Sequence, residues 1–173
     1  MITNKTIWIS LILFSCVDKE SLTIQEMKLL PYFEGDTLVY QSSEGLRDTI
    51  FITKRQIRNY NPGDLSSRWL YRPLEGSIKY YTSNSRDEKN LILVYKRDDK
   101  LSYNGYWPNF YGWIDNTDFS PSLESFVKNN KSEAQIFESK KVSVENNVKR
   151  IYLRLNGVYK YITVDDIEWI RIN

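Results

Sequence analysis

The amino-acid sequence predicts a mainly β protein, a single antiparallel meander domain of about eight strands with one short helix. Period-two alternation of apolar and polar residues, together with turn signals, dominates from Thr37 onward. Apolar residues make up 41% of the chain and aromatic residues 14%, which is enough to fill a core. We expect a half-open or lipocalin-like barrel, with a two-sheet sandwich as the alternative.

The first half of the domain is expected to consist of hairpins. The segments "TLVYQS" and "DTIFITKRQI" flank "SEGLR", which is typical of a hairpin with a glycine-containing loop. Turns are expected at 61–64 and 73–76, and a charged loop at 84–90. The segment "LILVYK" is apolar on both faces, so we place it inside the sheet. The strands expected in this half cover residues 37–42, 48–57, 68–72, 77–83, 91–96 and 101–103.

The one expected helix spans residues 121–129. Ser120 can cap this helix, and the proline at its start suits a first helical turn. Leu123, Phe126 and Val127 then share one side by the spacing of three and four residues. The four strands expected after the helix lie within residues 134–144, 149–155, 158–163 and 167–172.

The strongest hairpin signal in the chain is Asn156-Gly157, because both residues tolerate a positive φ. A two-residue turn here pairs Leu155 with Val158 and places an aliphatic face toward the core. The opposite face is a second candidate binding surface, since tyrosine offers large contact area at low entropic cost. Half-buried covering of the core is the alternative. The residues expected on this face are Tyr152, Arg154, Tyr159 and Tyr161.

The first sixteen residues are typical of a lipoprotein signal peptide. Lys5 precedes an apolar run, residues 7–14, that is too short to cross a bilayer. The run leads into "LFSC", which resembles the lipobox of bacterial lipoproteins, where the cysteine is lipidated and becomes the new N-terminus. Cys16 is the only cysteine, so it forms no intrachain disulfide. The expected segments are a signal peptide at 1–15, a lipidated Cys16 and tether at 16–30, and a β domain at 31–173.

Both ends of the domain resemble small lipoproteins of Bacteroidota. The start, "LPYFEGDTLVYQSSEG", carries the pattern P-x-x-x-G-[ND]-x-x-V-Y, and the end, "VKRIYLRLNGVYKYITVDDIEWIRI", carries a tyrosine strand, a glycine turn and a tryptophan strand. The resemblance implies a β-rich outer-membrane lipoprotein of the bacterial cell envelope, facing the periplasm or exposed on the surface. The segment "CVDKE" resembles the surface-export signal of such lipoproteins. The matching positions are Pro31, Gly35, Asp36, Val39, Tyr40, Tyr152, Gly157 and Trp169.

The composition excludes several chemistries. The chain has no histidine, which removes histidine-dependent nucleophilic catalysis and histidine zinc sites. Removing the signal peptide takes away one of 24 basic residues and none of 22 acidic ones, so a nucleic-acid partner is not expected. No cofactor or metal is expected either. An enzyme would be a carboxylate-based glycoside hydrolase. Its candidate carboxylates are Asp98, Asp99, Asp115, Asp118, Asp165 and Asp166, none of which forms a distinctive pair.

The segment "YNGYWPNFYGW", residues 103–113, is the most concentrated binding signal. Pro108 favours a loop or sheet edge, so Trp107 is expected to be exposed, whereas Trp113, which precedes Ile114, is expected to pack inward. Rings held on such a loop can stack on sugars or bind an apolar ligand. The alternative is that a loop crossing a barrel end uses its rings to fill the core. The candidate binding residues here are Tyr103, Tyr106, Trp107 and Tyr111.

These observations predict a lipid-anchored, non-enzymatic envelope protein that binds a glycan or a small apolar ligand. The alternative is an accessory or structural subunit that docks on another envelope protein, and the third hypothesis is the glycoside hydrolase. An internal cavity lined by aromatic residues would favour ligand binding, whereas an exposed apolar patch would favour docking. The expected attachment to the membrane is the lipid on Cys16.

Overall fold

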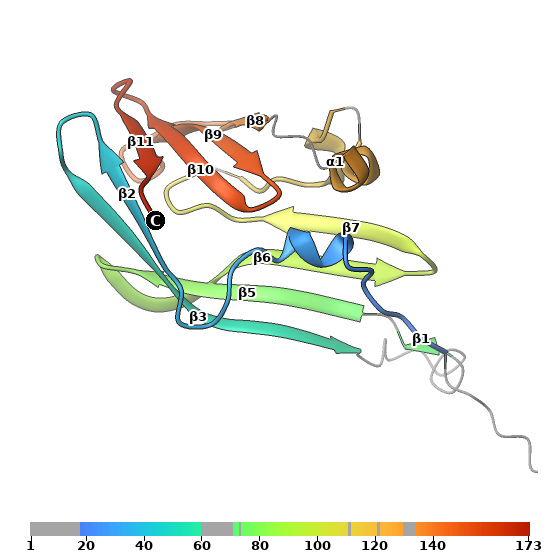
Figure 1. The fold of residues 1–173 in the computed structure, drawn as a ribbon. Helices are drawn as coiled ribbons and strands as arrows, with labels where there is room; N and C mark the ends of the chain where they lie inside the picture. The colour runs from blue at the N-terminus through green and yellow to red at the C-terminus, as the bar shows by residue number, and fades with distance from the viewer. Residues whose placement is uncertain (1–17, 60–70, 73, 111, 121, 130–133) are drawn as a thin grey trace, which may run out of the picture.

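Nine antiparallel strands form one sheet that curls into a half-open barrel (Figure 1). The computed structural model describes residues 18–59, 71–72, 74–110, 112–120, 122–129 and 134–173. The strands of the sheet are β2 (Thr37–Ser42), β3 (Arg47–Asn59), β5 (Leu74–Thr82), β6 (Ser85–Arg97), β7 (Lys100–Gly105), β8 (Gln135–Glu138), β9 (Val148–Arg154), β10 (Gly157–Thr163) and β11 (Glu168–Arg171). The prediction of a mainly β, half-open barrel is confirmed.

The sheet consists of two meanders, and its strand order is β7-β6-β5-β3-β2-β11-β10-β9-β8. The meanders join where β11 pairs with β2, with Trp169 opposite Ser42 and Arg171 opposite Tyr40. The strands β7 and β8 are therefore the edges of the sheet, and the opening of the barrel lies between them. A separate parallel pair is formed by β1 (Asp18–Lys19) and β4 (Tyr71–Arg72).

Two boundaries in the first meander differ from the prediction. Strand β5 begins at Leu74, inside the turn expected at 73–76, and β6 begins at Ser85, so the charged stretch at 84–90 is mostly strand. The charged start of β6 pairs with β5, and its side chains form hydrogen bonds to residues of the neighbouring strands. Glu88 accepts hydrogen bonds from the hydroxyl of Thr53 at 2.7 Å and from Nζ of Lys79 at 2.9 Å. The turn expected at 61–64 lies outside the described residues.

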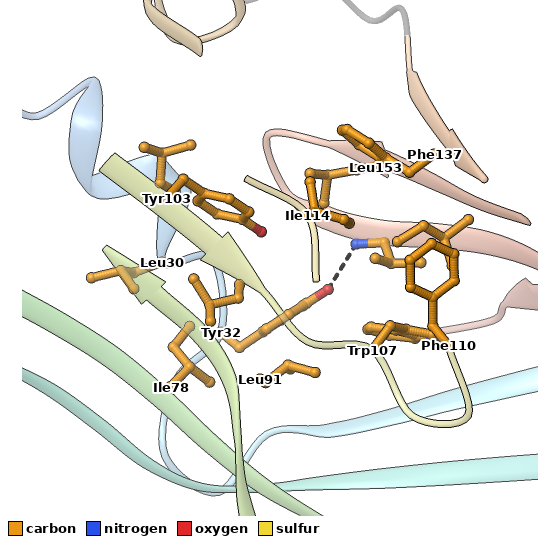
Figure 2. Packing of buried hydrophobic residues seen from close by; sticks show 14 of the residues in the cluster. Leu30, Tyr32, Ile78, Leu91, Tyr103, Trp107, Phe110, Ile114, Phe137 and Leu153 are labelled. Carbon is orange, nitrogen blue, oxygen red and sulfur yellow. Dashed lines mark hydrogen bonds between the residues drawn. The ribbon is translucent and has the colours of Figure 1, made fainter. Parts of the chain in front are cut away.

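Residues 20–36, which we call the strap, belong to the folded domain. The strap runs from β1 through the short helix η1 (Glu26–Leu29) to the start of β2 (Figure 1). Leu29, Leu30 and Tyr32 are buried in the core, where Leu30 and Tyr32 lie beside Leu91 and Tyr103 (Figure 2). The part of the expected 16–30 tether that the structure describes is therefore not a free linker; its C-terminal end fills the barrel.

The predicted register of the C-terminal hairpin is wrong. Gly157 pairs with Arg154, so the turn is Leu155-Asn156, and a bulge lies between Val158 and Lys160. A bulge inserts one residue and changes which face the following side chains occupy. The bulge is stabilised because the backbone of Val158 bonds two buried tyrosines. Its N–H donates to the hydroxyl of Tyr32 at 2.8 Å (Figure 2). Its carbonyl accepts from the hydroxyl of Tyr40 at 2.7 Å.

The predicted helix is α1 (Leu123–Asn129), which follows the short helix η2 (Asn116–Asp118). Its three apolar residues, Leu123, Phe126 and Val127, are buried in the core as the spacing predicts. Their side of the helix packs next to Phe119, whose ring contacts Phe126 with centroids 5.2 Å apart. In the described part of the chain, no helix has the length and apolarity needed to cross a membrane.

Candidate functional site

The aromatic segment, residues 103–113, extends from β7 to a contact with β9 on the other side of the barrel opening. After β7 the chain loops out and returns, so that Gly105 and Ile114 exchange two backbone hydrogen bonds of 2.9 Å. At the far end of the loop, the carbonyl of Asn109 accepts from the N–H of Val148 in β9 at 3.0 Å. The inner side of the loop therefore faces the core. The segment's buried rings are Tyr103, Trp107 and Phe110 (Figure 2).

The expected exposures of the two tryptophans are wrong. Trp107 is only 6% exposed, and its ring meets that of Tyr40 edge to face at 5.6 Å. Trp113 is 52% exposed, with Nζ of Lys140 5.6 Å from its ring centroid. Pro108 keeps the segment out of a paired strand, but it does not decide which side of the loop faces the barrel. Tyr103 and Trp107 thus offer little surface to a ligand, Tyr106 is half-buried, and Tyr111 lies outside the described residues.

The interior of the barrel is filled. The cavity enclosed by Tyr32, Tyr103 and Trp107 has a volume of about 10 Å³, which is at most the space of one water molecule. The described part of the chain therefore encloses no ligand-sized cavity here.

The second candidate surface, on β9 and β10, is a half-buried layer of rings and cations. The guanidinium of Arg154 lies 3.9 Å from the ring centroid of Tyr159, and Nζ of Lys160 lies 4.8 Å from that of Tyr152. Tyr161 does not belong to this layer, because the bulge turns it into the core, where its hydroxyl donates to Asp48 at 2.7 Å. One face of each of the rings of Tyr152 and Tyr159 is therefore already occupied by a cation of the chain itself.

A large apolar concavity lies along the strap, and we call it the strap groove. It is open to solvent and has a volume of about 650 Å³, within the usual range for small-molecule sites. Ile24 is 78% exposed and Phe33 is 59% exposed, which is unusual for such large apolar side chains in one place. The apolar residues lining the groove are Ile24, Met27, Leu30, Pro31, Phe33 and Leu155; the polar ones are Lys28, Arg55 and Asn156.

An ion pair fixes the helix that carries one wall of the strap groove. Lys96, which is buried in β6, bonds the carboxylate of Glu26 in η1 at 3.1 Å. Burial opposes ionisation of Glu26, but hydrogen bonds from the N–H of Thr23 and from Lys96 outweigh it and hold the pKa of Glu26 below its usual value. Met27 and Lys28 follow directly in the same helix, so the pair positions them at the groove.

A smaller, polar cavity of about 200 Å³ lies beside the turn between β5 and β6. Its lining includes Asp48, Asp87, Lys89 and Asn109. The only aromatic ring in the described lining is that of Tyr80, which is buried. A sugar site needs an exposed ring face for stacking, so this cavity is a weaker candidate than the strap groove.

The carboxylates considered for hydrolysis lie in turns and caps. Asp115 and Asp118 form a reciprocal capping box around η2, and Asp98 and Asp99 occupy the positive-φ turn between β6 and β7. Asp166 pairs with Lys149 in the turn before β11, where Asp165 is exposed. Within the described residues, no group of three or more aspartate, glutamate, cysteine or histidine residues could hold a metal ion.

A scan against protein-family models, a search of curated proteins and a search of solved structures each gave no match to this chain. The candidate site therefore depends on the geometry of the chain itself. Sequence reasoning missed the strap groove because it assigned residues 16–30 to a tether. The sequence does contain a signal that this segment is part of the folded domain. The density of apolar residues in "LTIQEMKLLPYF" is high for a free linker.

The buried phenol of Tyr32 predicts a loss of stability in alkali. Burial raises the pKa of Tyr32 to about 12. Between pH 10 and 12 the folded chain keeps this proton and the unfolded chain loses it, so stability falls as pH rises through this window. The expected loss from this residue is about 2–3 kcal/mol. Urea unfolding across the window should show a shallower decline for Tyr32→Phe than for the unsubstituted chain. Parallel declines would contradict the assignment.

Proposed function

We propose that this chain is a lipid-anchored, non-enzymatic protein of the bacterial cell envelope that binds an apolar ligand in the strap groove. The observation that carries the proposal is the groove itself, an open apolar concavity of about 650 Å³ with Ile24, Met27 and Phe33 exposed along it. Leaving apolar area of this kind exposed to water costs free energy. Such a patch commonly marks a binding site. The tight packing around Tyr32, Tyr103 and Trp107 makes this open groove the better place for a ligand.

The proposed anchor is a lipid on Cys16, which lies outside the described residues. The lipobox-like "LFSC" and the short apolar run before it support lipidation and removal of residues 1–15. Strand β1 begins at Asp18, so Cys16 and the first strand are at most about 7 Å of extended chain apart. The anchor would hold the domain close to the outer membrane, where apolar molecules concentrate.

Photo-crosslinking in cells tests the groove with the full chain. Benzoylphenylalanine in place of Met27 is expected to capture an apolar molecule, because residue 27 lines the groove. The same residue in place of Val144, which is 98% exposed and outside the groove lining, is the control and is expected to capture little. Adding Ile24→Glu to the first variant should abolish the adduct by placing a charge in the groove. Equal capture at positions 27 and 144 would contradict the proposal.

Docking on another envelope protein is the second candidate, and a specific observation favours it. Strand β8 is an edge of the sheet, and Ile136 in β8 is 55% exposed beside the exposed Trp113. An exposed edge strand can pair with a strand of a partner, and the two apolar side chains would add buried area. If docking is the function, benzoylphenylalanine in place of Ile136 should form an adduct with the mass of a protein. Benzoylphenylalanine at position 27 should then form no adduct.

A further inference from the structure

Arg55, on the wall of the strap groove, is a cation with no anionic partner in the part of the chain that the structure describes. Its guanidinium lies 4.6 Å from the ring centroid of Phe33, which holds it beside the apolar lining. Its Nε is buried and has no hydrogen-bond partner among the described residues. A buried donor without a partner costs free energy, which leaves the guanidinium of Arg55 with unused hydrogen-bonding capacity beside the groove.

Two further arginines beside the groove resemble Arg55 in having no described carboxylate partner. Arg154 and Arg171 also form no ion pair with a carboxylate in the part of the chain that the structure describes. Both lie next to the groove. Arg154 precedes the lining residue Leu155, and Arg171 donates to the carbonyl of Asn156 at 3.1 Å. The cations that do form ion pairs are Arg58, Lys79, Lys96, Arg97, Lys149, Arg150 and Lys160.

Among the described residues, the groove lining has cations and no carboxylate. Lys28 and Arg55 are its charged members, while the nearby Glu26 is held by Lys96 and faces β6. An apolar groove with positive charge on its wall complements a molecule that has an apolar body and a negative end. Arginine suits this role because its planar guanidinium can donate two parallel hydrogen bonds to a carboxylate or a phosphate.

We propose that the ligand of the strap groove is an amphiphile with one anionic head group, a carboxylate or a phosphate, bound by the guanidinium of Arg55. The apolar body of the ligand lies along Ile24, Met27 and Phe33, the exposed apolar residues of the lining. This inference rests on the proposed function, since it names the class of ligand that the same groove takes. It adds a requirement that the groove alone does not impose, namely that a negative charge strengthens binding.

The test uses membranes that contain the full chain and three photoreactive long-chain amphiphiles that differ only in the head group: carboxylate, phosphate or alcohol. Labelled peptides are mapped by mass spectrometry. The test variant is Arg55→Gln, which keeps a similar length and removes the charge. The matched control is Lys54→Gln, because the adjacent residue of β3 points to the opposite face and does not line the groove. Urea unfolding of both variants checks that each is folded.

In the unsubstituted chain, the carboxylate, the phosphate or both are expected to label the strap peptide about tenfold more strongly than the alcohol. The stronger of the two anions identifies the head group. Arg55→Gln should reduce anion labelling to the level of the alcohol, and Lys54→Gln should leave it unchanged. Equal labelling by all three amphiphiles, unaffected by Arg55→Gln, would contradict the anionic subsite. The proposal of an apolar ligand in the groove would still hold. Absence of strap labelling by every amphiphile would overturn both.

Discussion

Replacing Trp107 with alanine is expected to lower the free energy of unfolding by about 3–5 kcal/mol. The indole is buried where the aromatic segment covers the barrel opening. Its ring lies 5.6 Å from that of Tyr40 and 6.3 Å from that of Tyr161. Truncation would remove these contacts and leave a cavity that the closely packed neighbours cannot fill. Urea unfolding followed by circular dichroism measures the loss.

Trp113→Ala is the matched control, since it removes the same side chain from the same segment. Trp113 is 52% exposed, and its ring lies beside the side chain of Lys140. The expected change is within about 0.5 kcal/mol, as for other surface substitutions. Similar large losses for both variants would mean that the whole segment is core and that its outer side is not exposed.

Replacing Gly157 with alanine is expected to cost about 3 kcal/mol or more, for two separate reasons. Gly157 has φ +100°, a conformation that costs an L-residue with a side chain about 1–2 kcal/mol. A Cβ at this position would also overlap the buried phenol of Tyr32, with Cε1 only 2.6 Å away. Because Tyr32 is held by its hydrogen bond to Val158, it cannot move aside without losing that bond, and overpacking adds about 1–3 kcal/mol.

Gly45→Ala separates the two causes. Gly45 also has a positive φ of +81°, but a Cβ there would meet nothing within 4 Å. Its expected cost is therefore the backbone cost alone, about 1–2 kcal/mol. Thermal or urea unfolding of the two variants gives the comparison. Equal losses at Gly45 and Gly157 would show that Tyr32 does not press against the hairpin.

The strands and the helix could be predicted because their signals are local. Alternation in "TLVYQS" and the side shared by Leu123, Phe126 and Val127 follow from backbone geometry, and the structure confirms both. The charged start of β6 could not be predicted, since Glu88 is stabilised by Thr53 and Lys79 from two other strands. Such cross-strand bonds are invisible until the register is known.

The errors at the candidate sites also arise from tertiary contacts. The bulge that turns Tyr161 inward depends on Tyr32 and Tyr40, which lie more than a hundred positions away and bond the backbone of Val158. The burial of Trp107 depends on where its loop crosses the barrel, which the sequence of the loop does not encode. Residue type alone therefore located the aromatic segment but could not assign its inner and outer sides.

The strap groove could not be predicted because three distant segments form it. Ile24 and Phe33 come from the strap, Arg55 comes from β3, and Leu155 comes from the turn of the β9–β10 hairpin. Only the curled sheet brings these segments together. The sequence does contain the apolar residues that line the groove, but it gives no sign that they share one concave surface.

The most direct test of the central claim is the mass of what benzoylphenylalanine captures at position 27 in intact cells. If the strap groove binds an apolar ligand, the adduct should be a single small molecule, and Ile24→Glu should remove it. Anionic character of that molecule would agree with the role of Arg55. No adduct above the level at position 144, or an adduct with the mass of a protein, would contradict the proposed function.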